Sequence, residues 1–106
     1  MHLALILNSL NAETMSNAFR LGAFSLASGD AVTVFLMGEA VEIGRADDSW
    51  FGLPGKARAF IHEGGDVLAC GTCLQNHGLG ASDIYQTSDM KALHDLIGRA
   101  DRVLSF

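Results

Sequence analysis

The chain has 106 residues, of which 49% are hydrophobic, and its net charge is −5 at pH 7. This size predicts a single domain over residues 1–106, because a chain this short has room for one core. The negative charge argues against general nucleic-acid binding, which needs a basic surface to displace counterions. The apolar runs are too short to span a membrane and the N-terminus lacks secretory-signal features, so we expect a cytoplasmic protein without membrane association.

Five apolar runs predict β-strands, the fourth of them weakly. Most are continuous rather than alternating, which is typical of strands buried on both faces of a parallel sheet. The runs are Leu3–Leu7, Val32–Met37, Val67–Ala69, Ile84–Tyr85 and Val103–Phe106.

Four segments between these runs have the spacing or the end signals of helices. They are Ala12–Ala27, a segment from Pro54 to a stop at Gly64-Gly65, Thr72–His77, and Ser88–Gly98 with Ser88-Asp89 as capping residues. Strands and helices therefore alternate along the chain. This order predicts an α/β fold, a three-layer α/β/α sandwich around a mostly parallel five-stranded sheet.

The segment Glu39–Leu53 does not fit this alternation. It contains two glycines, four acidic residues and the adjacent aromatic pair Trp50-Phe51. A loop of this length in a small domain is usually functional or part of an interface. We therefore expect a long loop here, with Trp50-Phe51 as a candidate subunit contact.

The sequence Cys70-Gly71-Thr72-Cys73 follows the third predicted strand and opens a short predicted helix. Open α/β sheets bind ligands at the carboxyl ends of their strands, and the start of a helix stabilises a thiolate. Cys70 is therefore a candidate nucleophile that could carry sulfur as a persulfide. Cys73, one helical turn later, could resolve it as a disulfide, and Gly71 would let a substrate approach the backbone.

Other interpretations of these cysteines stay open. Each could be a small buried apolar residue. Together with His77 they form C-x2-C-x3-H, but a structural zinc site needs a fourth ligand, and we expect no metal and no cofactor. A thioredoxin-type dithiol centre usually follows the first long strand and precedes a long helix, unlike the pair here.

Neighbouring polar residues are weaker candidates for the same site. Thr72 would cap the short helix beside Cys70, and His77 could supply a proton or a positive charge there or simply end the helix in solvent. Asn8, Ser9 and Asn11 follow the first predicted strand at the same edge of the sheet. They could line a pocket, or they could form the turn and the N-cap of the first helix.

The pattern Gly65-x-x-x-x-Cys70-Gly71-Thr72-Cys73-x-x-x-x-Gly78-Leu79 resembles the signature of the DsrE/DsrF-like family, which includes the sulfur-relay TusBCD subunits and YchN-like proteins. Residues 3–8, 32–38 and 100–106 resemble the family's first, second and closing strands, so the resemblance covers nearly the whole chain. Asn76-His77 replaces a basic pair of several relay members, and Cys73 is an additional cysteine. The chain is therefore more similar to the YchN-like branch.

This resemblance implies a parallel five-stranded sheet and a homo-oligomer, a trimer or hexamer. It also implies a sulfurtransferase-type persulfide carrier. In such a carrier Cys70 accepts sulfur from a donor and passes it on to an acceptor, and these partners are proteins or small thiols. Two other functions remain: a non-catalytic oligomeric module that binds a small ligand or a protein, and a Cys70/Cys73 dithiol redox protein.

Overall fold

A computed structural model describes residues 1–46 and 51–106 of the chain. Trp50 lies outside the described residues. The elements in chain order are β1 (His2–Leu7), α1 (Ala12–Ala27), β2 (Ala31–Leu36), the 3-10 helix η1 (Gly38–Arg45), α2 (Leu53–His62), β3 (Asp66–Cys70), α3 (Gly71–Asn76), β4 (Gln86–Ser88), α4 (Met90–Arg99) and β5 (Arg102–Ser105).

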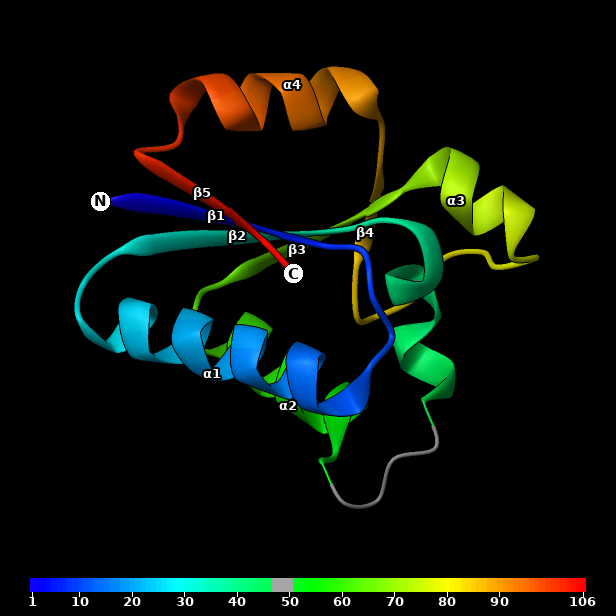
Figure 1. The fold of residues 1–106 in the computed structure, drawn as a ribbon, viewed down its shortest axis with the longest axis horizontal. Helices are drawn as coiled ribbons and strands as arrows, with labels where there is room; N and C mark the ends of the chain where they lie inside the picture. The colour runs from blue at the N-terminus through cyan, green and yellow to red at the C-terminus, as the bar shows by residue number, and fades with distance from the viewer. Residues whose placement is uncertain (47–50) are drawn as a thin grey trace.

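The strands form one five-stranded sheet in the order β4-β3-β2-β1-β5, and every neighbouring pair is parallel. Helix α4 covers one face of the sheet, and α1 and α2 cover the other, which gives three layers (Figure 1). The predicted α/β/α sandwich is therefore confirmed. No helix in the described part of the chain is long and apolar enough to cross a membrane.

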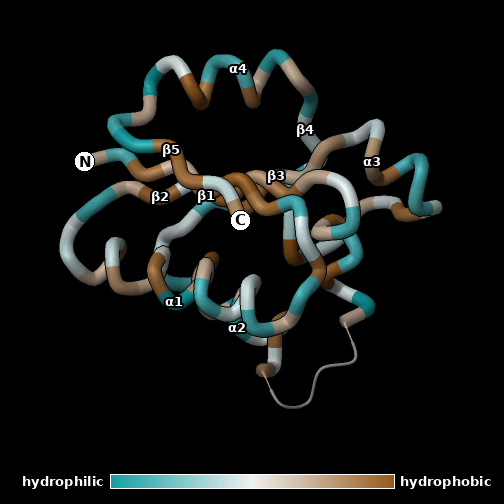
Figure 2. The backbone as a smooth tube through the Cα atoms, in the orientation of Figure 1, coloured by the Kyte–Doolittle hydropathy of each residue, from teal (hydrophilic) through white to brown (hydrophobic). Residues whose placement is uncertain are grey.

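The hydrophobic core has two parts, one on each face of the sheet. The larger part lies under α1 and α2 and includes Leu5, Phe19 and Phe60. The smaller part lies under α4 and includes Phe35 and Cys70. Hydrophobic segments run through the sheet, while the outer helices alternate between hydrophobic and hydrophilic residues (Figure 2). Burial on both faces explains why the strands have continuous apolar sequences.

Local signals place the ends of the two helices on the larger core. The side chain of Asn11 accepts a hydrogen bond from the Thr14 backbone N–H at 3.0 Å and so caps α1. Helix α2 has Pro54 in its first turn and is followed by Gly64, whose φ of 102° is in the left-handed region. Both helices have nearly the bounds that the sequence predicts.

The predicted loop 39–53 differs from the structure, because residues 38–45 form η1. This helix buries Ala40, Val41 and Ile43 against the larger core. Phe51 also packs against this core, and the Lys56 ammonium lies 5.8 Å from the centre of its ring. The described part of this segment therefore packs against the core of the same chain, and a role of Trp50-Phe51 as a subunit contact stays a prediction.

The fourth strand lies slightly later than predicted. Ile84 and Tyr85 are buried but precede β4, which consists of the polar residues 86–88. Ser88 ends this strand, and Asp89 alone caps α4 by accepting a hydrogen bond from the Ala92 N–H at 2.9 Å. The buried apolar residues here thus lie just before the strand, and the strand is defined by its pairing with β3 rather than by an apolar sequence.

Candidate functional site

Cys70 lies at the point where β3 passes directly into α3. It is the last residue of the strand and the N-cap of the helix, and only 2% of its surface is exposed. The sequence predicts Thr72 as the cap, whereas the observed cap is Cys70, two residues earlier, and Thr72 lies inside the helix. Because all strands are parallel, their carboxyl ends share one edge, and Cys70 lies at this edge beside the end of β4.

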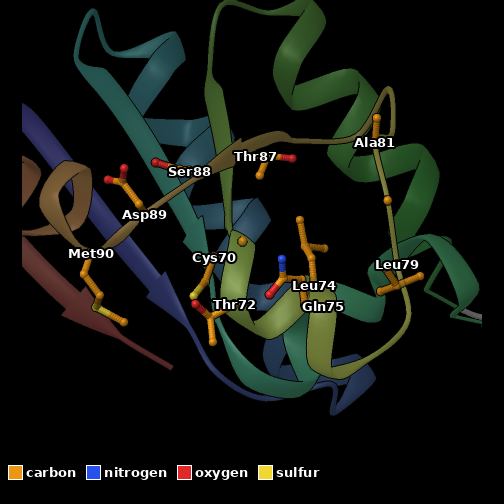
Figure 3. A pocket seen from close by; sticks show the side chains of 12 residues that line it. Cys70, Thr72, Leu74, Gln75, Leu79, Ala81, Thr87, Ser88, Asp89 and Met90 are labelled. Carbon is orange, nitrogen blue, oxygen red and sulfur yellow. The ribbon is translucent and has the colours of Figure 1, made fainter.

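A cleft of about 410 Å³ opens beside Cys70. Its volume is within the range of small-molecule sites in proteins. Cys70 and Thr72 lie together, with Asp89 and Met90 on one side and Leu79 on the other (Figure 3). The lining residues are Cys70, Gly71, Thr72, Leu74, Gln75, Leu79, Gly80, Ala81, Thr87, Ser88, Asp89 and Met90.

Cys73 is half-buried and in contact with Cys70, but it is not part of the cleft lining. Both cysteines are free thiols. A hydrogen bond with the Gly38 backbone lowers the pKa of Cys73, but burial and the neighbouring Cys70 outweigh it, and the net effect is a raised pKa. Cys73 is therefore a neutral thiol at neutral pH.

The polar residues after β1 lie at the same edge but are largely occupied by local interactions. Ser9 accepts a hydrogen bond from the Asn11 N–H at 3.0 Å, and Asn11 caps α1. The side chain of exposed Asn8 packs closely against Gly38, where a side chain would overlap it. Ser9 and Asn11 thus have turn and capping roles, whereas Asn8 adjoins the residue that hydrogen-bonds Cys73.

His77 is at the far end of α3, away from the cleft lining. Its Nδ1 lies 2.9 Å from the Glu42 carboxylate, which also lies 3.4 Å from the Arg45 guanidinium. This contact joins α3 to η1. The structure therefore brings Cys70, Cys73, Gly71 and Thr72 together and places His77 in a separate polar group.

Comparison with known proteins identifies the family and the fold. The family model of the DsrE/DsrF-like family matches residues 1–106. The chain belongs to the DsrE/DsrF-like family. Recognition of the family from the cysteine motif is therefore confirmed.

The chain is also similar to one protein sequence and to two solved structures. An uncharacterised protein of Methanopyrus kandleri is 27% identical over 100 residues, covering 89% of this chain and 83% of that protein. The crystal structure of YchN from E. coli has a TM-score of 0.83 at 22% identity, with 100% of both chains covered. A conserved protein of unknown function from Bacteroides thetaiotaomicron has a TM-score of 0.82 at 18% identity, covering 99% and 94% of the two chains. The two structures share the fold of this DsrE/DsrF-like chain.

The described residues of this family member contain no group of three or more His, Cys, Asp or Glu side chains that could hold a metal ion. The histidine of the C-x2-C-x3-H pattern faces Glu42 instead.

The sequence analysis missed the wall of the cleft opposite α3. This wall is formed by the segment 79–81 and by residues 87–90. Of these residues, the sequence analysis named Ser88 and Asp89 as helix caps and Leu79 as part of the family signature, and it named none of them as a residue of the site. The pairing of β4 beside β3 brings them to Cys70, and no short sequence pattern encodes that pairing.

Proposed function

We propose that this protein is a persulfide carrier of the sulfurtransferase type, with Cys70 as the sulfur acceptor. The observation that carries this proposal is the position of the Cys70 thiol, at the end of β3 and in the wall of a 410 Å³ cleft. Membership of the DsrE/DsrF-like family, which includes sulfur-relay subunits, supports the proposal.

The loading step is an exchange at sulfur. The Cys70 thiolate attacks the outer sulfur of a persulfide R–S–SH, a new S–S bond forms at Cys70, and the bond between the two donor sulfurs breaks. The thiolate R–S⁻ leaves and takes up a proton. The cleft gives the donor access to a cysteine that is otherwise buried. The partners in this proposal are donor and acceptor proteins or small thiols, and the reaction takes place in the cytoplasm, where thiols stay reduced.

We further propose that the protein forms a homo-oligomer, a trimer or a hexamer. Several large apolar side chains are exposed in the single chain, among them Phe24 at 74% and Met90 at 55%. Apolar surface of this kind favours association, because burial removes it from water. Sedimentation velocity tests this point, and a chain that stays monomeric at high concentration overturns it.

Intact-mass measurement after treatment with cysteamine persulfide tests the carrier function. We expect a gain of about 32 Da, one sulfur atom, that Cys70→Ser abolishes and Cys73→Ser preserves. The Cys73→Ser variant is the matched control, since it removes the other thiol of the same helix turn. No added sulfur and no loss of mass in any variant would overturn the proposal and leave a binding module. A loss of about 2 Da in the wild type, with no added sulfur on Cys73→Ser, would indicate a dithiol redox protein instead.

A further inference from the structure

The two thiols have different relationships to the cleft. Cys70 lines it, whereas Cys73 contacts Cys70 and is absent from the lining. Cys73 also packs against the core cluster under α4 that contains Cys70. Sulfur added to Cys70 has space in the cleft, and the second thiol is in contact with Cys70 without lining the cleft.

We propose that Cys73 discharges the Cys70 persulfide, so that the sulfur leaves as hydrosulfide and a Cys70–Cys73 disulfide remains. This inference rests on the proposed function, because it begins from the loaded Cys70. It adds an activity to that function: a persulfide reductase that releases sulfide, rather than a carrier that holds sulfur for a partner.

The step is a displacement at the inner sulfur. The Cys73 sulfur forms a bond to Cys70 Sγ, and the bond between Cys70 Sγ and the outer sulfur breaks. The step starts from the ionised persulfide, Cys70–S–S⁻, whose outer sulfur takes the electron pair of the broken bond and the Cys73 proton and leaves as HS⁻. The outer sulfur is thereby reduced by two electrons to sulfide, and the two cysteines are oxidised to a disulfide. A dithiol reductant then returns both cysteines to thiols.

The placement of the thiols favours attack on the inner rather than the outer sulfur. Displacement at sulfur requires the attacking atom, the attacked atom and the leaving atom to lie roughly in line. Cys73 contacts Cys70 and is not part of the cleft lining, whereas a sulfur added to Cys70 would occupy the cleft, so the proposed step has Cys73 and the outer sulfur on different sides of Cys70 Sγ. Attack on the outer sulfur would instead transfer it to Cys73, away from the cleft.

The surroundings of Cys73 hold it ready for this reaction. The Gly38 backbone hydrogen-bonds its sulfur, and α3 fixes its position one turn from Cys70. A nucleophile held in this way reacts with a high effective concentration. Because the pKa of Cys73 is raised, its thiol is protonated at neutral pH. Its proton therefore has to leave the sulfur as the new S–S bond forms, and the departing sulfide accepts it.

A single-turnover experiment tests the inference. The reduced full-length chain is mixed anaerobically with one equivalent of cysteamine persulfide, and samples are quenched over time for intact mass and for trapped sulfide. In the wild type we expect a transient gain of about 32 Da, then a net loss of about 2 Da with one equivalent of sulfide. In Cys73→Ser and Cys73→Ala we expect the added sulfur to persist at least about a hundredfold longer without sulfide release.

The outcomes separate this inference from the proposed function. If neither the wild type nor the Cys73 variants gain sulfur or release sulfide, the proposed function fails and the inference fails with it. If the added sulfur persists equally in the wild type and in Cys73→Ser, the carrier function stands and the inference is overturned. Peptide mapping that finds the sulfur on Cys73, without sulfide release, shows attack at the outer sulfur and also overturns it.

Discussion

The backbone of Gly71 lies against the carbonyl of Ser88, so closely that a methyl group on Gly71 would lie 3.1 Å from the Ser88 oxygen. Its next neighbour would be the Thr87 methyl group at 3.4 Å. The first turn of α3 therefore packs on β4 without space for a side chain. This contact sets the position of Cys70 relative to the opposite wall of the cleft.

Gly71→Ala should disturb this packing. A backbone carbonyl cannot rotate away as a side chain can, so α3 and β4 must move apart by a few tenths of an ångström. We expect a loss of about 1 kcal/mol in the free energy of unfolding and faster alkylation of Cys70. Urea denaturation and timed alkylation measure the two effects.

Gly80→Ala is the control for this substitution. Gly80 lines the same cleft, but a methyl group there would meet no atom within 4 Å. It should leave both stability and Cys70 alkylation nearly unchanged. Equal effects of the two substitutions would mean that the contact between Gly71 and Ser88 does not position the site.

Asp89 is the one charged side chain among the described residues that line the cleft, and it also caps α4. Asp89→Asn removes the charge and keeps a capping side chain, whereas Asp89→Ala removes both and should cost about 1 kcal/mol of stability. In the wild type, the Asp89 carboxylate attracts the ammonium group of cysteamine persulfide and repels the carboxylate of mercaptoacetate persulfide. We therefore expect Asp89→Asn to lower the preference for cysteamine persulfide over mercaptoacetate persulfide by a factor of at least about three.

The ratio of the two loading rates at Cys70 measures this preference. Glu63→Gln changes the net charge equally at an exposed residue outside the cleft and is the matched control. A ratio that shifts equally in both variants would assign the effect to overall charge, and no shift in either would show that Asp89 does not select the donor.

The strands and long helices could be predicted because their signals are local. Residues 12–27 have both a helical spacing and a capping Asn11, and the strands in the sheet centre are continuously apolar. The helix η1 could not be predicted in this way. It is a 3-10 helix held by burial of Val41 and Ile43 and by the contact between Glu42 and His77, which is 35 residues away in sequence.

The candidate site was predictable in part for the same reason. Cys70 and Cys73 are close in sequence, so a single helical turn fixes their proximity. Asp89 and Leu79 approach Cys70 only through the strand order, in which β4 lies beside β3. The contact of Gly38 with Cys73 likewise depends on β2 and β3 being neighbours, which a linear pattern does not specify.

Cys73 should titrate above the ordinary thiol value of 9.0, because the lowering effect of the Gly38 backbone is outweighed by burial and by Cys70. Cys70→Ala removes one of the raising contributions and should lower the Cys73 midpoint. Ultraviolet absorbance of the thiolate during a pH titration measures it. Because the pKa of Cys73 is raised, the folded chain holds the Cys73 proton more tightly than the unfolded chain does. The resulting stabilisation is fully present below 9.0 and is lost as the pH rises through the raised pKa, so the free energy of unfolding should decrease on the alkaline side. A midpoint unaffected by Cys70→Ala would contradict the contact between the thiols.

Asp83 precedes β4 and is joined to α2, because its carboxylate accepts a hydrogen bond from Arg58 Nε at 2.8 Å. This bond lowers the pKa of Asp83 below 3.8, so its stabilising effect is present above that value and is lost as pH falls through the lowered pKa. We expect Asp83→Asn to be less stable than the wild type near neutral pH, with the difference vanishing in strong acid.

Urea denaturation across pH measures this, and Arg58→Gln, alone and combined with Asp83→Asn, is the control. A difference that persists unchanged in acid, or adds fully in the double variant, would show that the ion pair does not hold this segment.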